Sequence, residues 1–339
     1  MMRSLYSGIS GLRNHQTRMD VIGNNIANVN TTGFKASRVV FQDVFSQTVS
    51  SGMANTGVQG GTNPVQIGLG IRLATVDVLH TRSAFSRTDN PLDVSIAGDG
   101  FFIVGAENED GSGYDRMYTR AGNFSIDSDG YLVSAHGLFV LGMNKDIIWG
   151  EIVPADPGSA NDTPAITDPA DPNFRPASPA VMGFVQGPGE PTFGRIHIGA
   201  FKPDLDAQGD PIVNNGIAQG EQVRLPDFSV AADGTISVLA NNRQLPIAQL
   251  QLAVFSNPGG LQKAGNSLFI ETASSGAPDD LLPGEDGAGV IEAGGLEMSN
   301  VDLASEFTDM IVTQRGFQAN SRIITVSDTM LEELVNLKR

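Results

Sequence analysis

Apolar residues recur at helical spacing at the two ends of this chain, and this pattern constrains the fold more than any other feature. Near the N-terminus these residues are separated by 4, 3, 7, 3, 4 and 3 positions, as in a helix that packs along a seam. They are Leu5, Ile9, Leu12, Met19, Ile22, Ile26 and Val29. Asn28, Asn30 and Gly33 favour turns, so the helix is expected to end among them.

The C-terminal segment carries a seven-residue repeat. Its first set of positions is Leu303, Met310, Phe317, Ile324 and Leu331, and its companion set is Phe307, Gln314, Ser321, Asp328 and Val335. Half of that seam is polar, and a second apolar set, Ile323, Met330 and Leu337, leaves apolar surface on more than one side. An ordinary two-helix hairpin within one domain is the alternative. One partner helix cannot cover so much apolar surface, which favours assembly with helices from other copies.

The middle of the chain has the pattern of β-strands. Short alternating runs such as 71–78 and 247–254 are bounded by Gly, Asn, Asp or Pro, as in a small antiparallel sheet. Residues 145–222 differ, because they hold 11 of the 18 prolines, and 11 Asp and Glu against 4 Lys and Arg. We interpret them as an acidic module of strands or loops that is inserted into the β-domain. The patterns together predict an α+β fold with terminal helices outside a split, mainly antiparallel β-domain.

The composition excludes several classes of protein. With 38 acidic against 21 basic residues the net charge is -17, which repels phosphate, so no nucleic-acid partner is expected. Cysteine is absent, which removes disulfides, thiolate metal sites and cysteine nucleophiles. No window approaches the roughly 18 uninterrupted apolar residues of a membrane helix. Polar residues from Asn14 to Asp20 argue against a secretory signal peptide, so any export would use another route.

No pattern indicates catalysis, a cofactor or a metal. The four histidines are not at metal-ligand spacing. The run Asp127-Ser128-Asp129-Gly130 is like the start of a calcium loop, but its twelfth position is Leu138, and a hairpin turn is the simpler interpretation. Glycine pairs at Gly68 and Gly98 lack the third glycine and the helix of a dinucleotide site. We therefore expect no catalytic, cofactor or metal residues, and a protein that is not an enzyme.

Both ends carry motifs that resemble the signatures of bacterial flagellar rod and hook proteins. The N-terminal motif is Met19-Asp20-Val21-Ile22-Gly23-Asn24-Asn25-Ile26-Ala27-Asn28-Val29-Asn30-Thr31-Thr32-Gly33-Phe34-Lys35. The C-terminal motif comprises Leu296-Glu297-Met298-Ser299-Asn300-Val301-Asp302-Leu303 and Gln314-Arg315-Gly316-Phe317-Gln318-Ala319-Asn320-Ser321. The motif residues singled out are Asn24, Asn25, Asn28, Gly33, Phe34, Ser299, Asn300, Val301 and Asp302. The resemblance does not reach residues 145–222.

The resemblance implies a nested set of domains. They are a coiled-coil-like helical domain that lines a tube (1–33 and 296–339), a linking segment (34–70), a middle β-domain (71–144 and 223–295) and an outer β-rich domain (145–222). It also implies a homopolymer in which the terminal helices pack within one subunit and then between neighbours. The residues expected to make these contacts are Leu5, Ile9, Leu12, Met19, Ile22, Ile26, Phe307, Met310, Phe317, Ile324 and Leu331.

Within the family, the inserted module favours the hook, a curved tube that transmits torque as a flexible joint. The alternative is the distal rod, a straight drive shaft, which the glycine- and serine-rich stretch from Ser46 to Thr62 resembles. The implied partners are further copies, the distal rod, the hook cap, the hook–filament junction proteins and the type III export apparatus, with an extracellular location. An alternative of another class is a secreted β-rich binding protein or enzyme whose helices form a stalk, which would need a convergent polar cluster in a pocket.

Overall fold

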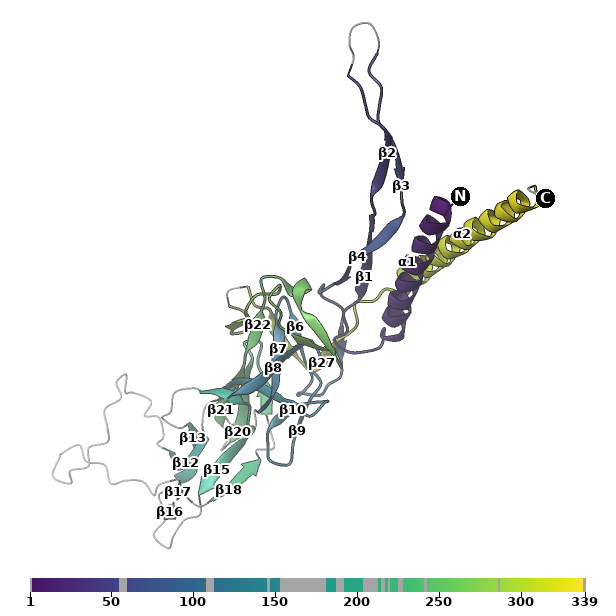
Figure 1. Cartoon of the computed structure of the whole chain (residues 1–339). Helices are drawn as coiled ribbons and strands as arrows, with labels where there is room; N and C mark the ends of the chain where they lie inside the picture. The colour runs from purple at the N-terminus through teal and green to yellow at the C-terminus, as the bar shows by residue number, and fades with distance from the viewer. Residues whose placement is uncertain are drawn as a thin grey trace, which may run out of the picture. The chain divides into compact units, whose positions relative to one another are not determined.

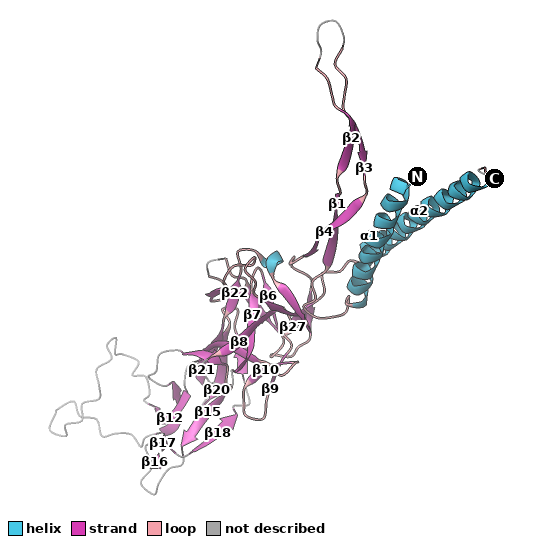
Figure 2. Cartoon of the chain, viewed as in Figure 1, coloured by secondary structure: helices cyan, strands magenta, loops and turns pink. Residues whose placement is uncertain are grey.

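The computed structural model of the chain describes residues 2–54, 60–107, 113–144, 147–152, 181–186, 192–203, 213–214, 217–218, 220–224, 228–240, 243–285 and 287–337. The chain divides into two compact units, whose elements are labelled in Figure 1. Unit 1 comprises Met1–Ala84 and Met298–Arg339, and unit 2 comprises Phe85–Glu297. Figure 2 shows that the two long helices belong to the terminal segments and that the middle of the chain is built of strands. The predicted α+β fold is confirmed.

Unit 1 combines two helices with a two-stranded ribbon. Its elements are α1 (Met2–Ala27), β1 (Ser37–Asp43), β2 (Ser46–Ser50), β3 (Val65–Gly68), β4 (Ile71–Val78) and α2 (Leu303–Asn336). The first helix ends where Asn28 Nδ2 donates to the carbonyl oxygen of Asn24 at 2.9 Å, followed by Gly33 at φ 67. The second begins at Asp302, whose carboxylate accepts from the backbone N–H of Ala304 at 2.9 Å. Neither helix in the described part of the chain is long and apolar enough to span a membrane.

The ribbon is one antiparallel hairpin. Strands β1 and β4 pair with Val39 opposite Val76, and β2 and β3 continue the pairing with Gln47 opposite Ile67. Strand β4 therefore belongs with β1 in unit 1, although residues 71–78 were assigned from the sequence to the middle β-domain. The alternating pattern of these residues is that of any half-buried strand and does not indicate which partner it takes.

Unit 2 is built of strands. They are β5 (Phe85–Arg87), β6 (Val94–Ala97), β7 (Phe101–Glu107), β8 (Tyr114–Thr119), β9 (Phe124–Ile126), β10 (Leu132–Ser134), β11 (Phe139–Asn144), β12 (Ile147–Ile152), β13 (Val181–Gln186), β14 (Thr192–Arg195), β15 (Gly199–Pro203), β16 (Val213–Asn214), β17 (Ile217–Ala218), β18 (Gly220–Arg224), β19 (Phe228–Val230), β20 (Thr235–Ala240), β21 (Arg243–Leu250), β22 (Leu252–Val254), β23 (Gln262–Gly265), β24 (Leu268–Ile270), β25 (Asp279–Leu281), β26 (Val290–Ala293) and β27 (Gly295–Glu297), with a 3-10 turn at Pro258–Gly260.

A 13-stranded sheet forms the body of unit 2, with the order β19-β20-β21-β11-β7-β8-β24-β23 along its main path. It joins strands from both sides of the inserted segment, since β11 pairs antiparallel with β7 and with β21. Its core is apolar and includes the fully buried side chains of Phe102, Val104, Val140, Val238 and Leu252.

The inserted segment supplies a separate four-stranded sheet of order β13-β12-β15-β18, in which only the β12–β15 pair is parallel. One strand of this segment, β14, instead pairs with β11 in the main sheet, with Asn144 opposite Thr192. The chain thus returns to the main sheet in the middle of the predicted outer domain, 145–222. The rest of that prediction lies partly outside the described residues.

Candidate functional site

The two terminal helices pack against each other in antiparallel orientation. Gly8 faces Ile324, Gly11 faces Asn320, and Arg18 Nη2 forms an ion pair with Asp309 Oδ1 at 3.1 Å. Of the residues predicted to make helix contacts, Ile22 is buried. A further eight are half-buried: Leu5, Leu12, Met19, Ile26, Met310, Phe317, Ile324 and Leu331. Ile9 and Phe307 are 39% and 51% exposed, so within one chain neither lies in the seam.

The helices approach closely at glycines. A methyl group added at Gly11 would lie 2.5 Å from Asn320 Nδ2, and one added at Gly316 would lie 2.8 Å from the imidazole ring of His15. Atoms cannot remain at such separations, so a larger side chain at either position would force the Asn320 or His15 side chain to move. The two glycines therefore leave room for these side chains where the helices meet.

The seam of α2 uses a different companion set from the predicted one. The residues that face α1 are Glu306, Thr313, Asn320 and Ser327, of which Thr313 and Ser327 are buried. The predicted companions are all exposed: Phe307, Gln314, Ser321, Asp328 and Val335. The prediction was wrong by one residue. In a seven-residue repeat the companion position can lie either three or four residues after the first position, and the prediction used four where the structure has three. Small hydroxyl side chains at the three-residue offset permit the close approach that the glycines require.

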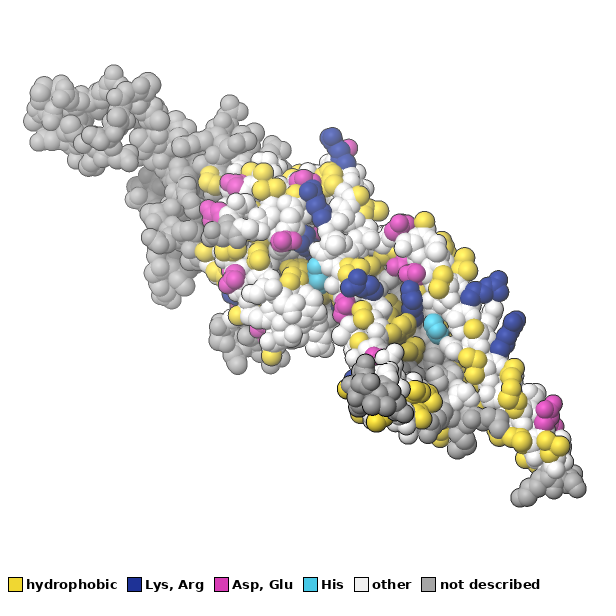
Figure 3. Space-filling view, turned by 90° about the horizontal axis from the view of Figure 1, so that it is seen from above, with side chains coloured by type: hydrophobic (Ala, Val, Ile, Leu, Met, Phe, Trp, Pro, Cys, Tyr) yellow, Lys and Arg dark blue, Asp and Glu magenta, His cyan; other side chains and the backbone are white. Residues whose placement is uncertain are grey.

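The apolar side chains of α2 lie mostly on its outer surface. The exposed ones are Leu303, Phe307, Ile311, Val312, Ile323, Val326, Met330, Leu334, Val335 and Leu337, and we call them the α2 apolar surface. Figure 3 shows yellow hydrophobic side chains along this helix toward its C-terminal end. The predicted second set, Ile323, Met330 and Leu337, is part of this surface. An exposed apolar surface of this kind is typical of a site of contact with another molecule.

Asn25 connects three elements of unit 1. Its side chain is buried, and its Nδ2 donates to the Ser37 carbonyl oxygen and to Glu306 Oε1, both at 2.9 Å. Its Oδ1 accepts from the backbone N–H of Ser37 at 3.0 Å. The end of α1, the start of β1 and the first turn of α2 are thus held by one amide. Asn14, the residue before His15, makes a similar link, because its Nδ2 donates to the Ile71 carbonyl oxygen at 2.8 Å.

Asn300 makes the corresponding links from the C-terminal motif. Its Oδ1 accepts from the backbone N–H of Ala36 at 2.7 Å, and its Nδ2 donates to the Leu79 carbonyl oxygen at 2.8 Å and to Thr81 Oγ1 at 2.9 Å. The preceding residue, Ser299, is buried, and its carbonyl oxygen accepts from Ser83 Oγ at 2.7 Å.

The remaining motif residues have local roles. Asp302 caps α2, Asn28 and Gly33 end α1, and the backbone N–H of Phe34 donates to the Thr31 carbonyl oxygen at 3.3 Å. The side chains of Phe34 and Val301 are half-buried and that of Asn24 is exposed. Together, Asn25, Asn300, Ser299 and their partners form what we call the polar node of unit 1.

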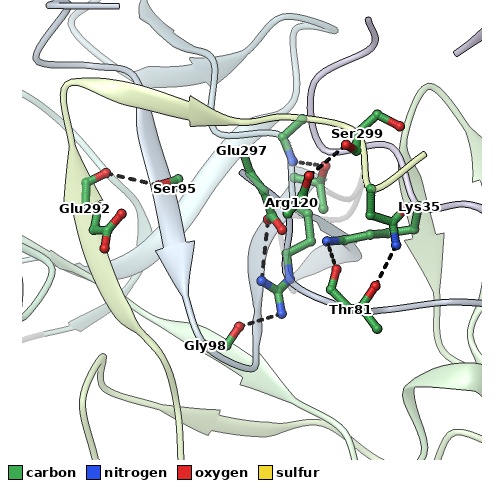
Figure 4. A network of polar contacts seen from close by, with 12 residues as sticks. Lys35, Thr81, Ser95, Gly98, Arg120, Glu292, Glu297 and Ser299 are labelled. Atoms are coloured by element: carbon green, nitrogen blue, oxygen red, sulfur yellow. Dashed lines mark hydrogen bonds and ion pairs between the residues drawn. The ribbon is translucent and has the colours of Figure 1, made fainter. Parts of the chain in front are cut away.

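Lys35 is a member of this node that sequence reasoning did not single out. Its side chain is 1% exposed, and Nζ donates to the Thr81 carbonyl oxygen at 2.8 Å, as Figure 4 shows. A lysine two residues after the left-handed Gly33 and two before a strand was the available signal, but lysine is most often exposed. Figure 4 also draws a buried ion pair of unit 2, in which Arg120 Nη1 lies 3.5 Å from Glu297 Oε2 and Nη2 donates to the Gly98 carbonyl oxygen at 2.9 Å.

Two titratable groups of the helix pair have shifted pKa values. Burial, with a smaller effect of the Arg18 charge, lowers the pKa of His15 below its ordinary 6.5. The ring of His15 also lies edge-on to Phe41, with centroids 6.2 Å apart, and its Nδ1 is buried without a hydrogen-bond partner. Burial raises the pKa of Glu306, although the hydrogen bond from Asn25 opposes the shift. Both shifts disfavour charge in the seam.

Within the described residues no group of three or more His, Asp or Glu side chains is arranged to hold a metal ion. The geometry instead offers a precisely registered helix pair and an unfilled apolar surface. Such an arrangement can position a chain for contacts with other chains; we find no constellation in unit 1 arranged for bond-making chemistry.

Comparison with known proteins gives three family matches along the chain. Residues 5–35 match the family described as flagella basal body rod protein, and residues 292–337 match the C-terminal family of flagellar basal body rod FlgEFG proteins. Residues 95–171 match the D1 domain of the flagellar hook proteins FlgE/F/G. The two terminal matches contain Asn25, Ser299 and Asn300 of the polar node and most of the helix pair.

Similar proteins align over their whole length. The chain is 41% identical to the flagellar basal-body rod protein FlgG of Bacillus subtilis, over 100% of both chains. It is 35% identical to the flagellar hook protein FlgE of Borreliella burgdorferi and 32% identical to that of Treponema pallidum, again over 100% of each chain. A crystal structure of Helicobacter pylori flagellar hook protein FlgE2 matches 63% of this chain and 100% of its own, at 12% identity and a TM-score of 0.33.

Proposed function

The chain belongs to the family of flagellar rod and hook proteins, and on this premise we propose that it is the subunit of the hook. As a member of this family it is a structural component of the flagellar hook or rod and not an enzyme. The proposal adds that its polymer is a curved tube that bends as it transmits torque. Its partners in that role are further copies, the distal rod, the hook cap, the hook–filament junction proteins and the type III export apparatus, and its location is extracellular.

The observation that carries the hook assignment is the four-stranded sheet β13-β12-β15-β18, which the chain builds between β11 and β19 in addition to the main sheet. The family resemblance implies that distal rod proteins usually lack an outer module, although the rod protein FlgG at 41% identity aligns over 100% of this chain, the inserted segment included. The distal rod is the second candidate, and two observations favour it. The relative at 41% identity is named as a rod protein, and the chain extends a ribbon from β2 and β3 as far as the bridge between Met53 and Thr62.

The α2 apolar surface supports assembly of many copies. It is carried on one helix, and we propose that it packs against a different surface of a neighbouring copy. Contacts between unlike surfaces do not close on two copies, and they continue into a ring or a helical filament. The tube is built in this way, with the α1–α2 pair of one copy packed on the pairs of its neighbours.

Substitution of one exposed residue on α2 tests this role. Phe307→Ser should leave the unfolding midpoint of the unpolymerised chain within error, because the side chain is exposed there, and should strongly lower the yield of tubes. Gln314→Ser, an exposed polar position one heptad further along, is the matched control and should polymerise normally. Equal tube yields for both variants, measured by sedimentation and electron microscopy, would remove Phe307 from the assembly surface.

Bending requires that the outer contacts change while the inner ones hold. On our proposal the inserted sheet makes weak polar contacts between copies, which permit relative motion of domains. Its role can be tested without disturbing the main sheet, because Asn144 and Thr192 are already paired across β11 and β14. Replacement of residues 145–191 by an Asn-Gly turn closes that hairpin directly and removes β12 and β13, two of the four strands of the inserted sheet.

Electron microscopy of polymers of the full chain and of the shortened chain is the test. Curved tubes from the full chain and straighter tubes from the shortened one are expected. Straight, rigid tubes from the full chain would move the assignment to the distal rod. Loss of tubes on shortening would contradict the division between inner helices that hold the tube and an outer module that shapes it.

A further inference from the structure

The ribbon of unit 1 has an apolar face that the described part of the chain leaves uncovered. Figure 1 shows β2 and β3 continuing the hairpin beyond β1 and β4. The Leu69 N–H donates to the Phe45 carbonyl oxygen at 3.2 Å, so these two residues are opposite each other. Ile67 is opposite Gln47 in the same pairing. Because side chains alternate between the faces of a strand, one face holds what we call the ribbon apolar face: Phe45, Val65, Ile67 and Leu69.

The opposite face of the ribbon is polar. It carries Thr48 and Gln66, and Gln66 Nε2 donates to Thr48 Oγ1 at 3.2 Å. A division into one apolar and one polar face is typical of strands that are buried on one side. Here both faces are exposed, since Phe45 is 77% exposed and every described residue of 42–54 and 60–69 is exposed. A two-stranded hairpin is marginally stable in water unless another element covers its apolar face, so the ribbon requires a partner.

The charge of the chain indicates which partner fits the ribbon. The sequence has no charged residue between Asp43 and Arg72, although the whole chain carries a net charge of -17. Copies with that charge repel one another, and they approach at the lowest electrostatic cost through an uncharged segment. A strongly charged partner of another kind would find no opposite charge there. The occupant that fits is a second copy of this chain.

The α2 apolar surface is the matching surface on the second copy. It lies in the same unit as the ribbon, and both are exposed, so the two surfaces do not cover each other within one chain. Near its C-terminal end α2 carries Asp328, Glu332 and Glu333, which would repel an acidic partner but not the uncharged ribbon. Contact between the ribbon and this helix would remove two apolar surfaces from water at once.

We propose that the ribbon apolar face of one copy packs on the α2 apolar surface of a second copy, against Ile323, Val326 and Met330. These three exposed residues follow one another at spacings of three and four, so they share one face of the helix. Ribbon and helix are different surfaces, so each pair of copies keeps one free ribbon and one free helix, and the contact can be repeated. The inference rests on the proposed assembly of copies and does not depend on the choice between hook and rod.

The absence of cysteine makes cross-linking between copies a direct test. One full-length sample carries Ile67→Cys on the ribbon and another carries Val326→Cys on α2, and the two are mixed, polymerised and treated with a short bis-maleimide. Cross-linked dimers should form in the mixture, and neither sample polymerised alone should give them. Gln66→Cys, on the polar face next to Ile67, is the matched control and should give far less dimer with Val326→Cys.

Substitution of Ile67 by serine measures the contribution of this contact to assembly. The side chain is exposed in the unpolymerised chain, so the unfolding midpoint should not change. The critical concentration for polymerisation should rise about tenfold, the ratio that corresponds to burial of one large apolar side chain. Gln66→Ser is the matched control and should polymerise at the wild-type concentration.

The outcomes separate this inference from the proposed assembly. Tubes that form without a cross-link between ribbon and α2, or an unchanged critical concentration for Ile67→Ser, would overturn the contact and leave the assembly in place. Dimers from Ile67→Cys copies alone would assign the ribbon to another ribbon and would also overturn it. A chain that does not polymerise under any condition would overturn both proposals.

Discussion

Replacement of Asn25 by alanine tests whether the polar node holds unit 1 together. The substitution removes two hydrogen bonds with the Ser37 backbone and one with Glu306 Oε1. Neutral hydrogen bonds contribute about 1 kcal/mol each, and a bond to a charged group contributes about 1.5–3 kcal/mol. Asn25→Ala should therefore lower the free energy of unfolding of unit 1 by about 3–5 kcal/mol, even though alanine is the better helix former.

Chemical denaturation followed by far-ultraviolet circular dichroism measures this loss. Both long helices lie in unit 1, so the helical signal reports that unit. Asn24→Ala is the matched control, since Asn24 is the preceding residue on the same helix and its side chain is exposed, and it should change stability by less than about 0.5 kcal/mol. A loss below about 1 kcal/mol for Asn25→Ala, or equal losses for the two variants, would refute the reasoning.

A charge at the same position sharpens the test. Asn25→Asp keeps the acceptor for the Ser37 N–H but places a carboxylate beside that of Glu306. It should destabilise unit 1 more than alanine does at neutral pH. Adding Glu306→Gln should recover part of the loss, because the new amide can donate to the carboxylate. Absence of any recovery would show that the two side chains do not interact.

Three further tests address other contacts, each by denaturation of the unpolymerised chain. Gly11→Ala should weaken the helix pair by about 1–3 kcal/mol through overpacking, whereas Gly23→Ala, with no atom within 4 Å of the new methyl group, should stabilise α1 by about 0.5–1 kcal/mol; changes of the same sign would contradict this. Because the folded chain binds a proton to His15 less readily than the unfolded chain does, stability should fall as the pH drops below 6.5, and His15→Phe should flatten that dependence; an unchanged profile would exclude this histidine. Arg120→Met should destabilise unit 2 by about 3–5 kcal/mol by leaving Glu297 without its buried partner, as followed by near-ultraviolet circular dichroism, and a loss under about 1 kcal/mol would contradict the buried ion pair.

The sequence predicted both helices. For α2 it predicted the position of the helix, but only one of the two sets of residues that face α1. The start of α2 at Asp302 follows from the capping preference of aspartate, and the Met310, Phe317, Ile324 and Leu331 positions are at least half-buried as expected. The companion set was displaced because the prediction followed hydrophobicity, and Phe307 is the more apolar choice. Close packing against glycine selected Thr313 and its repeats instead, and this depends on the partner helix, which periodicity within one helix does not contain.

The motif identified residues of the polar node, but it did not predict their hydrogen-bond partners. The resemblance identified Asn25 and Asn300, yet their partners, the Ser37 and Ala36 backbone groups, are defined only when β1 and the helices are placed together. For the same reason, the sequence did not indicate which strands pair with each other. Residues 71–78 and β14 have ordinary strand patterns, and such patterns carry no information on which neighbour completes the ladder.

The seam of the helix pair holds polar as well as apolar side chains, while many apolar side chains of α2 are exposed, and this explains why assembly could be inferred before its surface was located. This seam holds Asn25, Thr313 and Ser327, while Phe307 and Val335 are exposed. Hydrogen bonds are directional, so the bond from Asn25 to Glu306 helps to fix the register of the two helices, whereas Ser327 bonds only its own helix. Apolar burial has no such direction, and the exposed apolar side chains of α2 leave part of it available after the chain has folded. One partner helix cannot bury all the apolar residues of α2. This excess follows from the number of apolar residues and does not depend on which positions of the repeat face α1. The error of one residue in the predicted seam therefore does not affect the prediction of assembly. It means only that Phe307 is available for contact with another copy instead of packing against α1 of its own chain.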